Sequence, residues 1–318
     1  MKIYKNIIEV PFSSKRALTI GSFDGVHLGH ISILQKLLTE NQKHLKTMVL
    51  TFEPLPRSFF NKNANFKLLT TNDEKLSIFE KKGIDETFVI PFNEEFANLS
   101  AIDFINNYLY KKIGFNKLYI GFNNYFGKNR TGSYELLKSL HLPDIEVIPC
   151  NPIVNNNTVI SSSKIRKLIA NGNIEDANTM LGRTYSIKGT IIKGKQIGRK
   201  IGFPTINIQI DKNKLLPKNA VYACEIELKP QILNIETETQ IRLKGMANIG
   251  IRPTLNNTKN INLEVNIFDF YNEVYHYTAE VFFKKYIREE RKFENVESLV
   301  KQINKDKILC IEYFNASN

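Results

Sequence analysis

Apolar positions in the first half of the chain follow two different periods. Short runs rich in Val, Ile, Leu and Phe alternate with longer segments whose apolar residues recur every three or four positions. Strands alternating with helices at this spacing predict βαβ units and a parallel sheet. The expected strands are 17–20, 47–52, 87–90 and 117–120, and the expected helices are 31–39, 72–82 and 101–111.

The pattern changes from Tyr185 onward. Runs of strand-like composition follow one another there with little helix between them, separated by Gly, Pro and Asn. Such a series predicts an antiparallel sheet closed into a small barrel. Segment 296–314 is apolar at helical spacing, so we expect a C-terminal helix packed across the barrel. The expected strands are 185–192, 205–210, 222–228, 241–249, 262–268 and 278–283.

A polar, Asn-rich stretch at 151–158 and two short helical patterns, 162–170 and 174–181, lie between these halves. Hydroxyl residues begin the first helix, as is typical of helix N-termini, and we expect the second to close the first domain. The predicted domains are 1–183 and 184–318, each long enough for its own core. The fold class is α/β: a Rossmann-like domain with a parallel sheet, followed by a small antiparallel β-barrel domain with a C-terminal helix.

Charge and composition limit the classes of binding partner that we expect. The formal charge of +12 would suit nucleic acid, but the basic residues are spread thinly and no aromatic-plus-basic motif accompanies them, so we expect no nucleic-acid partner. No apolar run is long enough to cross a bilayer and the N-terminus lacks a signal-peptide pattern, so we expect no membrane partner and a cytoplasmic location. Cys150, Cys224 and Cys310 lack CxxC spacing and predict buried free thiols. Weak self-association is left open.

The strongest chemical signal is GSFDGVHLGH at 21–30, where a strand gives way to a helix. Glycines there let the backbone approach a ligand, and the free N–H groups of a helix N-terminus bind anions. His27 and His30 are three residues apart, so both imidazoles can face one phosphate. This spacing fits stabilisation of charge on an α-phosphoryl group under attack, without a covalent intermediate. Taken singly, a Gly-rich turn or one His is more often structural.

This stretch resembles the HxGH signature of the nucleotidyltransferase superfamily, in the variant typical of prokaryotic bifunctional riboflavin kinase/FMN adenylyltransferases. The similarity continues through 51–57, 89–97, 121–127 and 161–166. The resemblance implies catalytic roles for His27, His30 and Arg166, and the guanidinium of an Arg suits phosphate oxygens. It also implies ATP or phosphate contacts from Gly21, Phe23, Asp24, Gly25, Gly29, Ser162 and Ser163, and flavin contacts from Asn123 and Phe126.

Two departures from the family pattern concern the first domain. Leu55 stands where the family commonly has His, so a polar contact to nucleotide or flavin is missing. Asn123 and Asn124 stand where the family often has Asp followed by Phe, and losing the aromatic ring loosens flavin or adenine packing. We therefore predict slower or differently tuned adenylylation. A kinase-active protein with weakened adenylyltransferase activity is left open as an alternative.

A second chemical signal lies at 189–207 and lacks the GxxxxGKS/T pattern. Thr205 and Asn207 are two residues apart, so on a strand a hydroxyl and an amide oxygen share one face and can hold Mg²⁺ beside ATP. The GFPTxN setting resembles the riboflavin kinase signature, which continues through 247–254, 263–271 and 286–293. The resemblance implies phosphate contacts from Gly189, Gly194, Gly198, Gly202 and Pro204, and flavin contacts from Arg288 and Phe293.

Glu264 falls in an otherwise apolar strand, where a carboxylate is costly to bury unless it is paired or functional. In the family the Glu of this motif is the proposed general base, which accepts the proton of the riboflavin 5′-hydroxyl as that oxygen attacks the γ-phosphate. The alternative is an ion pair with Arg252 or Arg288. Ala220 is one more departure from the family pattern, in which Gly usually stands before the pair that is Val221 and Tyr222 here.

Both sets of motifs together imply ATP-dependent conversion of riboflavin to FMN, then of FMN to FAD with release of pyrophosphate. The implied co-substrate is ATP, the implied cofactor is Mg²⁺, and the flavins are substrates and products. One rival is another HxGH transferase with an accessory barrel, acting on pantetheine phosphate or nicotinate mononucleotide; the kinase motifs argue against it. Another is a non-catalytic regulator that binds flavin or nucleic acid, supported by the departures and the basic charge alone.

Overall fold

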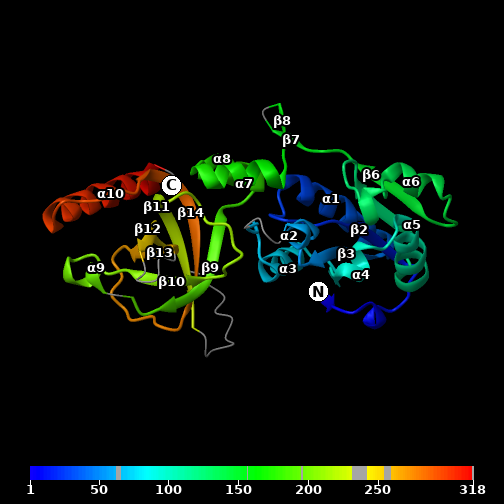
Figure 1. The fold of residues 1–318 in the computed structure, drawn as a ribbon, viewed down its shortest axis with the longest axis horizontal. Coiled ribbons are helices and arrows are strands. Elements are labelled where there is room, and N and C mark those ends of the chain that lie inside the picture. The colour runs from blue at the N-terminus through cyan, green and yellow to red at the C-terminus, as the bar shows by residue number, and fades with distance from the viewer. Residues whose placement is uncertain (62–65, 156, 195, 231–241, 254–258, 317–318) are drawn as a thin grey trace. The chain divides into compact units, whose positions relative to one another are not determined.

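The computed structural model describes residues 1–61, 66–155, 157–194, 196–230, 242–253 and 259–316, and gives the backbone alone for 251–253 and 259–261. The chain forms two compact units, Met1–Ser162 and Ser163–Asn318 (Figure 1). Each unit has its own sheet.

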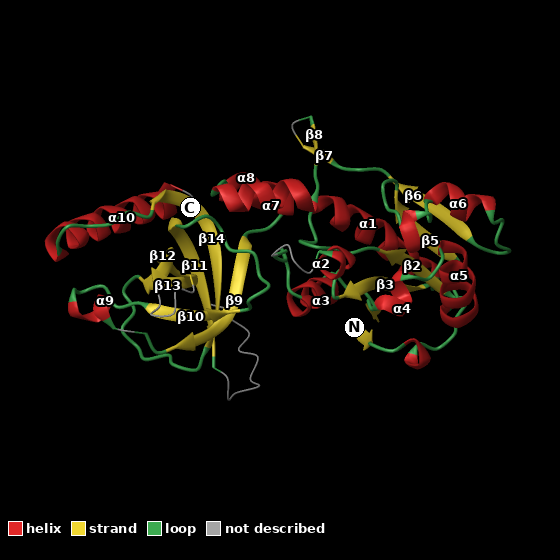
Figure 2. Ribbon diagram, in the orientation of Figure 1, coloured by secondary structure: helices red, strands yellow, loops and turns green. Residues whose placement is uncertain are grey.

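The first unit is built on a six-stranded parallel sheet (Figure 2). The predicted parallel sheet is confirmed. The two edge strands were not predicted, because β1 has only three residues and β6 contains a proline. In spatial order the strands are β1 (Lys2–Tyr4), β4 (Glu86–Pro91), β3 (Lys46–Glu53), β2 (Arg16–Ile20), β5 (Lys117–Gly121) and β6 (Glu146–Cys150).

Helices connect these strands, and the three predicted helices are found as α1, α3 and the α5–η3 segment, whose η3 part is a π-helix. A capping box between Thr71 and Glu74 explains where α3 begins. The helical elements are η1 (Ile7–Glu9), α1 (Leu28–Leu38), η2 (Thr39–Lys43), α2 (Pro56–Phe60), α3 (Asn72–Lys81), α4 (Glu94–Ala97), α5 (Ala101–Asp103), η3 (Phe104–Ile113), η4 (Lys128–Arg130) and α6 (Tyr134–Ser139). Strands β7 (Val154–Asn155) and β8 (Thr158–Val159) pair within the Asn-rich stretch, whose Asn156 lies outside the described residues.

Alternating strand residues enter two separate cores. Val49 lies in a cluster with Leu34 of α1 and Phe79 of α3. Its neighbour Leu50 lies in another cluster, with Phe104 and Leu109 of η3. Because side chains alternate across a strand, helices must cover both faces of this sheet. The unit is therefore a three-layer α/β fold.

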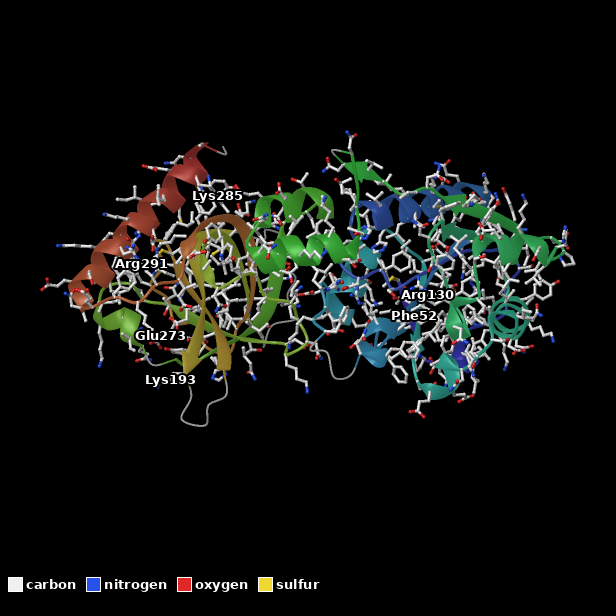
Figure 3. The ribbon with its side chains drawn as sticks, turned by 45° about the horizontal axis from the view of Figure 1, so that its top comes forward. Phe52, Arg130, Lys193, Glu273, Lys285 and Arg291 are labelled. Atoms are coloured by element: carbon white, nitrogen blue, oxygen red, sulfur yellow. The ribbon has the colours of Figure 1, made fainter. Side chains whose placement is uncertain are left out.

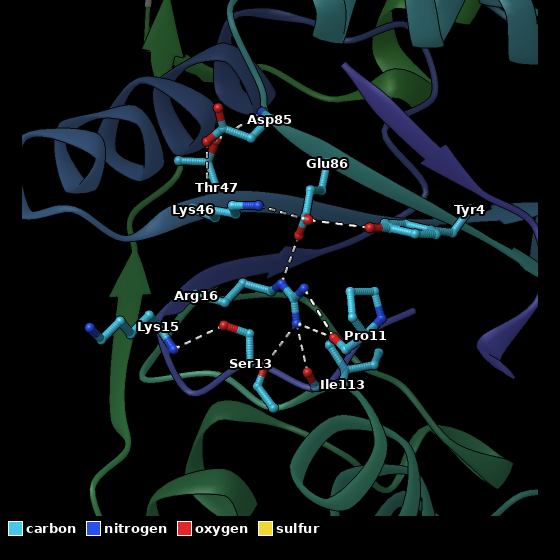
Figure 4. A network of polar contacts seen from close by, with 11 residues as sticks. Tyr4, Pro11, Ser13, Lys15, Arg16, Lys46, Thr47, Asp85, Glu86 and Ile113 are labelled. Atoms are coloured by element: carbon cyan, nitrogen blue, oxygen red, sulfur yellow. Dashed lines mark hydrogen bonds and ion pairs between the residues drawn. The ribbon is translucent and has the colours of Figure 1, made fainter. Parts of the chain in front are cut away.

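A buried ion pair holds the starts of the central strands. Arg16 is 1% exposed, and its Nε donates to Oε2 of Glu86 at 2.8 Å (Figure 4). Its Nη1 donates to the carbonyls of Ile113 at 2.6 Å and Pro11 at 3.2 Å, while Tyr4 donates to Glu86 Oε1 at 3.3 Å. One guanidinium thus joins β2, β4, the end of η3 and the N-terminal segment.

The second unit is a closed barrel of six antiparallel strands, as predicted (Figure 1). Helix α10 (Val296–Ala316) packs on β11, β12 and β14, which confirms the expected C-terminal helix. Ile241, the expected start of one strand, lies outside the described residues. Around the barrel the strands are β10 (Ile206–Ile210), β13 (Lys259–Ile267), β12 (Leu243–Pro253), β11 (Ala220–Lys229), β14 (Thr278–Glu289) and β9 (Tyr185–Ile192), and the short α9 (Ile197–Lys200) lies between β9 and β10.

Helices α7 (Ser162–Asn171) and α8 (Ile174–Leu181) precede the barrel. The expectation that the second of them closes the first domain is wrong, because α8 packs on β14 and β9. Asn178 fixes it there: its Nδ2 donates to the carbonyl of Phe283 at 2.9 Å and its Oδ1 accepts from the N–H of Tyr185 at 2.6 Å. The compact barrel unit therefore begins well before residue 184, while the functional domain boundary at 183/184 stays a prediction. Within the described ranges, no helix is both long and apolar enough to span a membrane.

Candidate active sites

The loop between β2 and α1 lies where the strand order of the sheet reverses. Strand β3 lies on one side of β2 and β5 on the other, so the chain leaves β2 beside the crevice between β2 and β5. Ligand sites of open parallel sheets form at such switch points, beyond the carboxyl ends of the strands. Asn124, in the loop after β5, donates to the carbonyl of Ile20 at 2.6 Å and so joins the two loops at this point.

The β2–α1 loop has an unusual backbone. Phe23, Gly25 and Val26 all have positive φ values, of 49°, 85° and 37°. The carboxylate of Asp24 accepts the N–H of Leu69 at 2.9 Å and that of Thr70 at 3.3 Å, and the Thr70 hydroxyl accepts the N–H of Gly25 at 3.0 Å. These bonds hold the strained turn in place. Asp24 therefore supports the loop from within the protein, and its contact with ATP stays a prediction.

The two histidines meet at the start of α1. Their rings stack with centroids 3.7 Å apart and planes 16° from parallel. Phe23 is buried and touches the His30 ring edge-on at 5.1 Å, so it supports His30 from behind. A Cβ at Gly29 would lie 3.2 Å from the His27 ring, which explains the glycine between them. The structure thus brings together the imidazoles that the sequence singled out, and gives Phe23 a packing role.

A buried lysine that the sequence reasoning missed lies beneath this loop. Lys75 of α3 is 3% exposed, and its Nζ donates to Oγ1 of Thr51 at 2.8 Å. The Thr51 hydroxyl in turn donates to the carbonyl of Ser22 at 3.3 Å. Burial lowers the pKa of Lys75 to about 8, although the nearby Asp24 and Glu53 carboxylates act in the opposite direction. The sequence did carry a signal for this residue, because Lys75 lies beside the apolar face of the predicted 72–82 helix.

Helix α7 supplies the predicted phosphate-binding residues of the 161–166 motif. The hydroxyl of Ser162, its first residue, donates to the carbonyl of Asp24 at 2.7 Å, so the helix begins at the His-containing loop. Arg166 follows Ser162 by four positions and Ser163 lies in the first turn. Residues four apart lie on one side of a helix. Arg166 and Ser162 therefore share a side of α7, and their contacts with ATP stay predictions.

The second site surrounds a cavity of about 310 Å³ at the barrel. Asn207 of β10 and Glu264 of β13 are direct cross-strand partners, although they are far apart in the sequence. The barrel therefore brings together the residues predicted for metal, base and flavin. Those that line the cavity are Gly198, Thr205, Asn207, Glu264, Arg288 and Phe293, with Asn266, Glu290, Arg291 and Asp306 beside them.

Glycines make room around this cavity. A Cβ at Gly194 would overlap the side-chain amide of Asn207, and one at Gly198 would overlap the carbonyl of Phe203. Neither Gly189 nor Gly194 lines a described cavity, but Gly189 differs because a Cβ there would overlap the carbonyl of Gln209 within the barrel and not a residue of the site. The structure therefore gives Gly189 a role in barrel packing.

Glu264 is hydrogen-bonded to a residue that the sequence reasoning did not identify. Asn262 Nδ2 donates to Glu264 Oε1 at 2.7 Å. The alternative of an ion pair between Glu264 and Arg288 is wrong, because Arg288 pairs with Asp306, with Nη2 and Oδ2 2.7 Å apart. The side chain of Arg252 lies outside the described residues. Asn262 and Glu264 alternate along β13 and so share a face, which is the signal that could have identified the asparagine.

A second cavity of about 350 Å³ adjoins the first. Gly202 and Pro204, both predicted to bind phosphate, line it. Gln196 and Thr205 line both cavities, so the cavities meet at these two residues. Arg291, at the first cavity, and Glu273, at the second, are labelled in Figure 3. Among the described residues, no group of three or more His, Cys, Asp or Glu is placed to hold a metal ion.

Comparison with known proteins matches the two parts of the chain to two different families. The family model described as FAD synthetase matches residues 10–164, and that described as riboflavin kinase matches residues 181–314. A bifunctional riboflavin kinase/FMN adenylyltransferase of Buchnera aphidicola is 39% identical over 99% of both chains. The chain belongs to this family of bifunctional enzymes. The enzyme of that name from Bacillus subtilis is 35% identical, over 95% of this chain and 93% of its own length.

A solved structure extends this likeness to the whole fold. The crystal structure titled "Macrolide-efflux Protein" from Streptococcus pneumoniae matches with a TM-score of 0.85 and 28% identity, over 97% of each chain. A sheet domain followed by a barrel domain is therefore found together in another known chain.

The departures from the family pattern now have local explanations. Leu55 is 7% exposed, so the position that is commonly His in the family holds a buried apolar side chain here. Asn124 uses its amide to join the β2 and β5 loops, as described above. Phe126, a predicted flavin contact, packs on Phe104 with centroids 5.8 Å apart, and Asn123 is exposed. The flavin contacts of Asn123 and Phe126 stay predictions.

Proposed function

We propose that this family member phosphorylates riboflavin to FMN at the barrel and adenylylates FMN to FAD at the parallel sheet, using ATP at both sites. The observation that carries the kinase half is the meeting of Thr205, Asn207 and Glu264 on one cavity. The stacked pair of His27 and His30 at the switch point of the sheet supports the transferase half.

In the kinase half, the first cavity takes the flavin and the second takes the nucleotide. Glu264, Arg288 and Phe293 line the first, whereas Gly202 and Pro204 line the second. Since Gln196 and Thr205 line both, the γ-phosphate lies near these residues. The carboxylate of Glu264 accepts the proton of the riboflavin 5′-hydroxyl while that oxygen attacks the γ-phosphorus, and ADP leaves.

Thr205, where the cavities meet, and Asn207 of the first cavity fit Mg²⁺. The hydroxyl of Thr205 and the amide oxygen of Asn207 are hard-oxygen ligands of the kind this ion takes. Gly194 leaves the space that the Asn207 amide occupies, and a Cβ would fill it. Asn207 is 6% exposed, so its oxygen is held rather than mobile in solvent. Bound Mg²⁺ would neutralise charge on the ATP phosphates.

In the transferase half, a phosphate oxygen of FMN attacks the α-phosphorus of ATP and pyrophosphate leaves. His27 and His30 donate hydrogen bonds to the oxygens on which charge develops. The N–H groups at the start of α1 bind the remaining phosphates. A phosphate contact from the guanidinium of Arg166 stays a prediction of the motif. No side chain forms a covalent bond in this scheme, because the arrangement offers donors rather than a nucleophile paired with a base.

The proposal includes a cytoplasmic location and turnover rather than regulation alone. The three cysteines are free and buried, in keeping with a reducing compartment. A non-catalytic regulator would not need Glu264 and Asn207 as cross-strand partners at a cavity, or two imidazoles stacked at a helix start.

Purified protein incubated with riboflavin, ATP and Mg²⁺ tests the proposal when riboflavin, FMN and FAD are separated by chromatography. Both FMN and FAD are expected. Glu264→Gln should lower FMN formation by roughly 10²-fold or more while supplied FMN is still converted to FAD. His30→Ala should do the reverse. Loss of both activities in either folded variant, or of neither, contradicts the two-site assignment.

A further inference from the structure

Asn262 lies between the two groups on which the kinase proposal depends. Its Nδ2 donates to Oε1 of Glu264 at 2.7 Å and to Oδ1 of Asn207 at 3.2 Å. An amide NH₂ has two hydrogens, one for each acceptor. Within the part of the chain that the structure describes, this side chain thus connects the candidate base with a candidate cation ligand.

The barrel register sets this contact. Glu264 lies directly opposite Asn207, and Asn262 precedes Glu264 by two positions on the same face of β13. On the other side of β13, Asn262 lies opposite Gly250, which has no side chain to compete for its amide. A Cβ at Gly250 would overlap the carboxylate of Glu290. The local packing therefore leaves Asn262 directed toward its two acceptors.

Each of these two hydrogen bonds fixes the orientation of a side chain that the proposed reaction uses. The bond to Glu264 is short, so it restrains a flexible side chain in one orientation. The bond to Asn207 fixes which end of that amide is presented, because the reversed amide would place its NH₂ against the NH₂ of Asn262. Only the oxygen end of Asn207 can bind a cation, and its burial makes a reversed, unsatisfied amide costly.

We propose that Asn262 is a positioning residue for phosphoryl transfer, which holds the Glu264 carboxylate and the Asn207 amide oxygen in the arrangement that the reaction uses. The inference rests on the proposed kinase activity of the barrel. The proposal gives Asn262 no contact with riboflavin. Replacing Asn262 should therefore change the kcat of the kinase and leave its KM for riboflavin unchanged. The proposal also predicts that replacing Asn262 changes the Mg²⁺ concentration that the kinase reaction needs.

The test uses the full chain with three variants. Asn262→Leu removes both donated bonds at similar size, and Asn262→Gln keeps an NH₂ donor. Asn304→Ala is the control, because Asn304 is exposed on α10 and lines neither cavity. Riboflavin phosphorylation is measured over a range of riboflavin and of Mg²⁺ concentrations. Conversion of supplied FMN to FAD is measured on the same samples, and thermal melting is followed by circular dichroism.

We expect Asn262→Leu to lower the kcat of the kinase about tenfold and to raise the Mg²⁺ concentration for half-maximal rate several-fold, as loss of alignment does. The KM of riboflavin should stay within about twofold, adenylylation should be unchanged, and Asn262→Gln should recover part of the kcat. Asn304→Ala should match the unmodified protein.

Three results would overturn the inference. Unchanged kcat and Mg²⁺ dependence in folded Asn262→Leu would show that neither hydrogen bond matters to the reaction. A raised riboflavin KM with normal kcat would make Asn262 a substrate contact. A lowered melting temperature with equal losses in Leu and Gln variants would make it structural. Failure of the proposed function is separate, since it would appear as kinase activity retained in Glu264→Gln or missing from the unmodified protein.

Discussion

Replacing Gly29 by Ala should stabilise helix α1 and slow the adenylylation of FMN. Alanine favours a helix over glycine by up to about 1 kcal/mol, and Gly29 lies in the first turn of α1. The added Cβ, however, would lie 3.2 Å from two atoms of the His27 ring, tighter than an ordinary contact, so the ring must shift by a few tenths of an ångström. His27 is buried and stacked on His30, so its shift disturbs both donors.

We expect adenylylation of FMN to fall about tenfold, which corresponds to about 1.4 kcal/mol of transition-state stabilisation. Thermal melting should be unchanged or slightly higher, and riboflavin phosphorylation in the same molecule should be normal. Gln35→Ala, at an exposed position of α1, controls for a change in helix propensity. Adenylylation at the unmodified rate in Gly29→Ala would refute the view that the ring of His27 is held in place for catalysis.

Two further predictions concern buried charges. Lys75 has a pKa of about 8 when folded and 10.5 as its ordinary value, so the unfolded chain binds more protons between these values and stability should rise with pH there. At about 1.4 kcal/mol per pH unit the gain is on the order of 3 kcal/mol. Lys75→Met should lose this rise of the unfolding free energy with pH, and the control Lys81→Met should keep it. Urea unfolding at several pH values measures both. Parallel pH profiles of Lys75→Met and the unmodified protein would contradict this. Arg16→Met should cost about 3–5 kcal/mol by leaving the Glu86 carboxylate buried without its guanidinium. Adding Glu86→Leu should recover part of that loss in the same assay, and a double variant less stable than Arg16→Met would argue against an uncompensated charge.

Sequence periodicity predicted most of the fold because long amphipathic and apolar segments report burial directly. The central strands of the first unit and all six barrel strands were predicted in this way. Strand β1 was missed because a three-residue strand shows no period, and its stability comes from pairing with β4. Helix α8 was assigned to the wrong unit, because its apolar face records that it is buried but not against which sheet.

The sequence by itself determined the chemical groups: paired imidazoles at a strand-to-helix turn, and a hydroxyl, an amide and a carboxylate in two distant segments. Their types and short-range spacing are local properties, which a motif records. Only the tertiary structure decided which distant groups meet, since strand register sets Asn207 opposite Glu264 and brings Asn262 to both. The same holds for Lys75 beneath the histidine loop, because burial and the neighbouring charges, not the residue type, set its pKa.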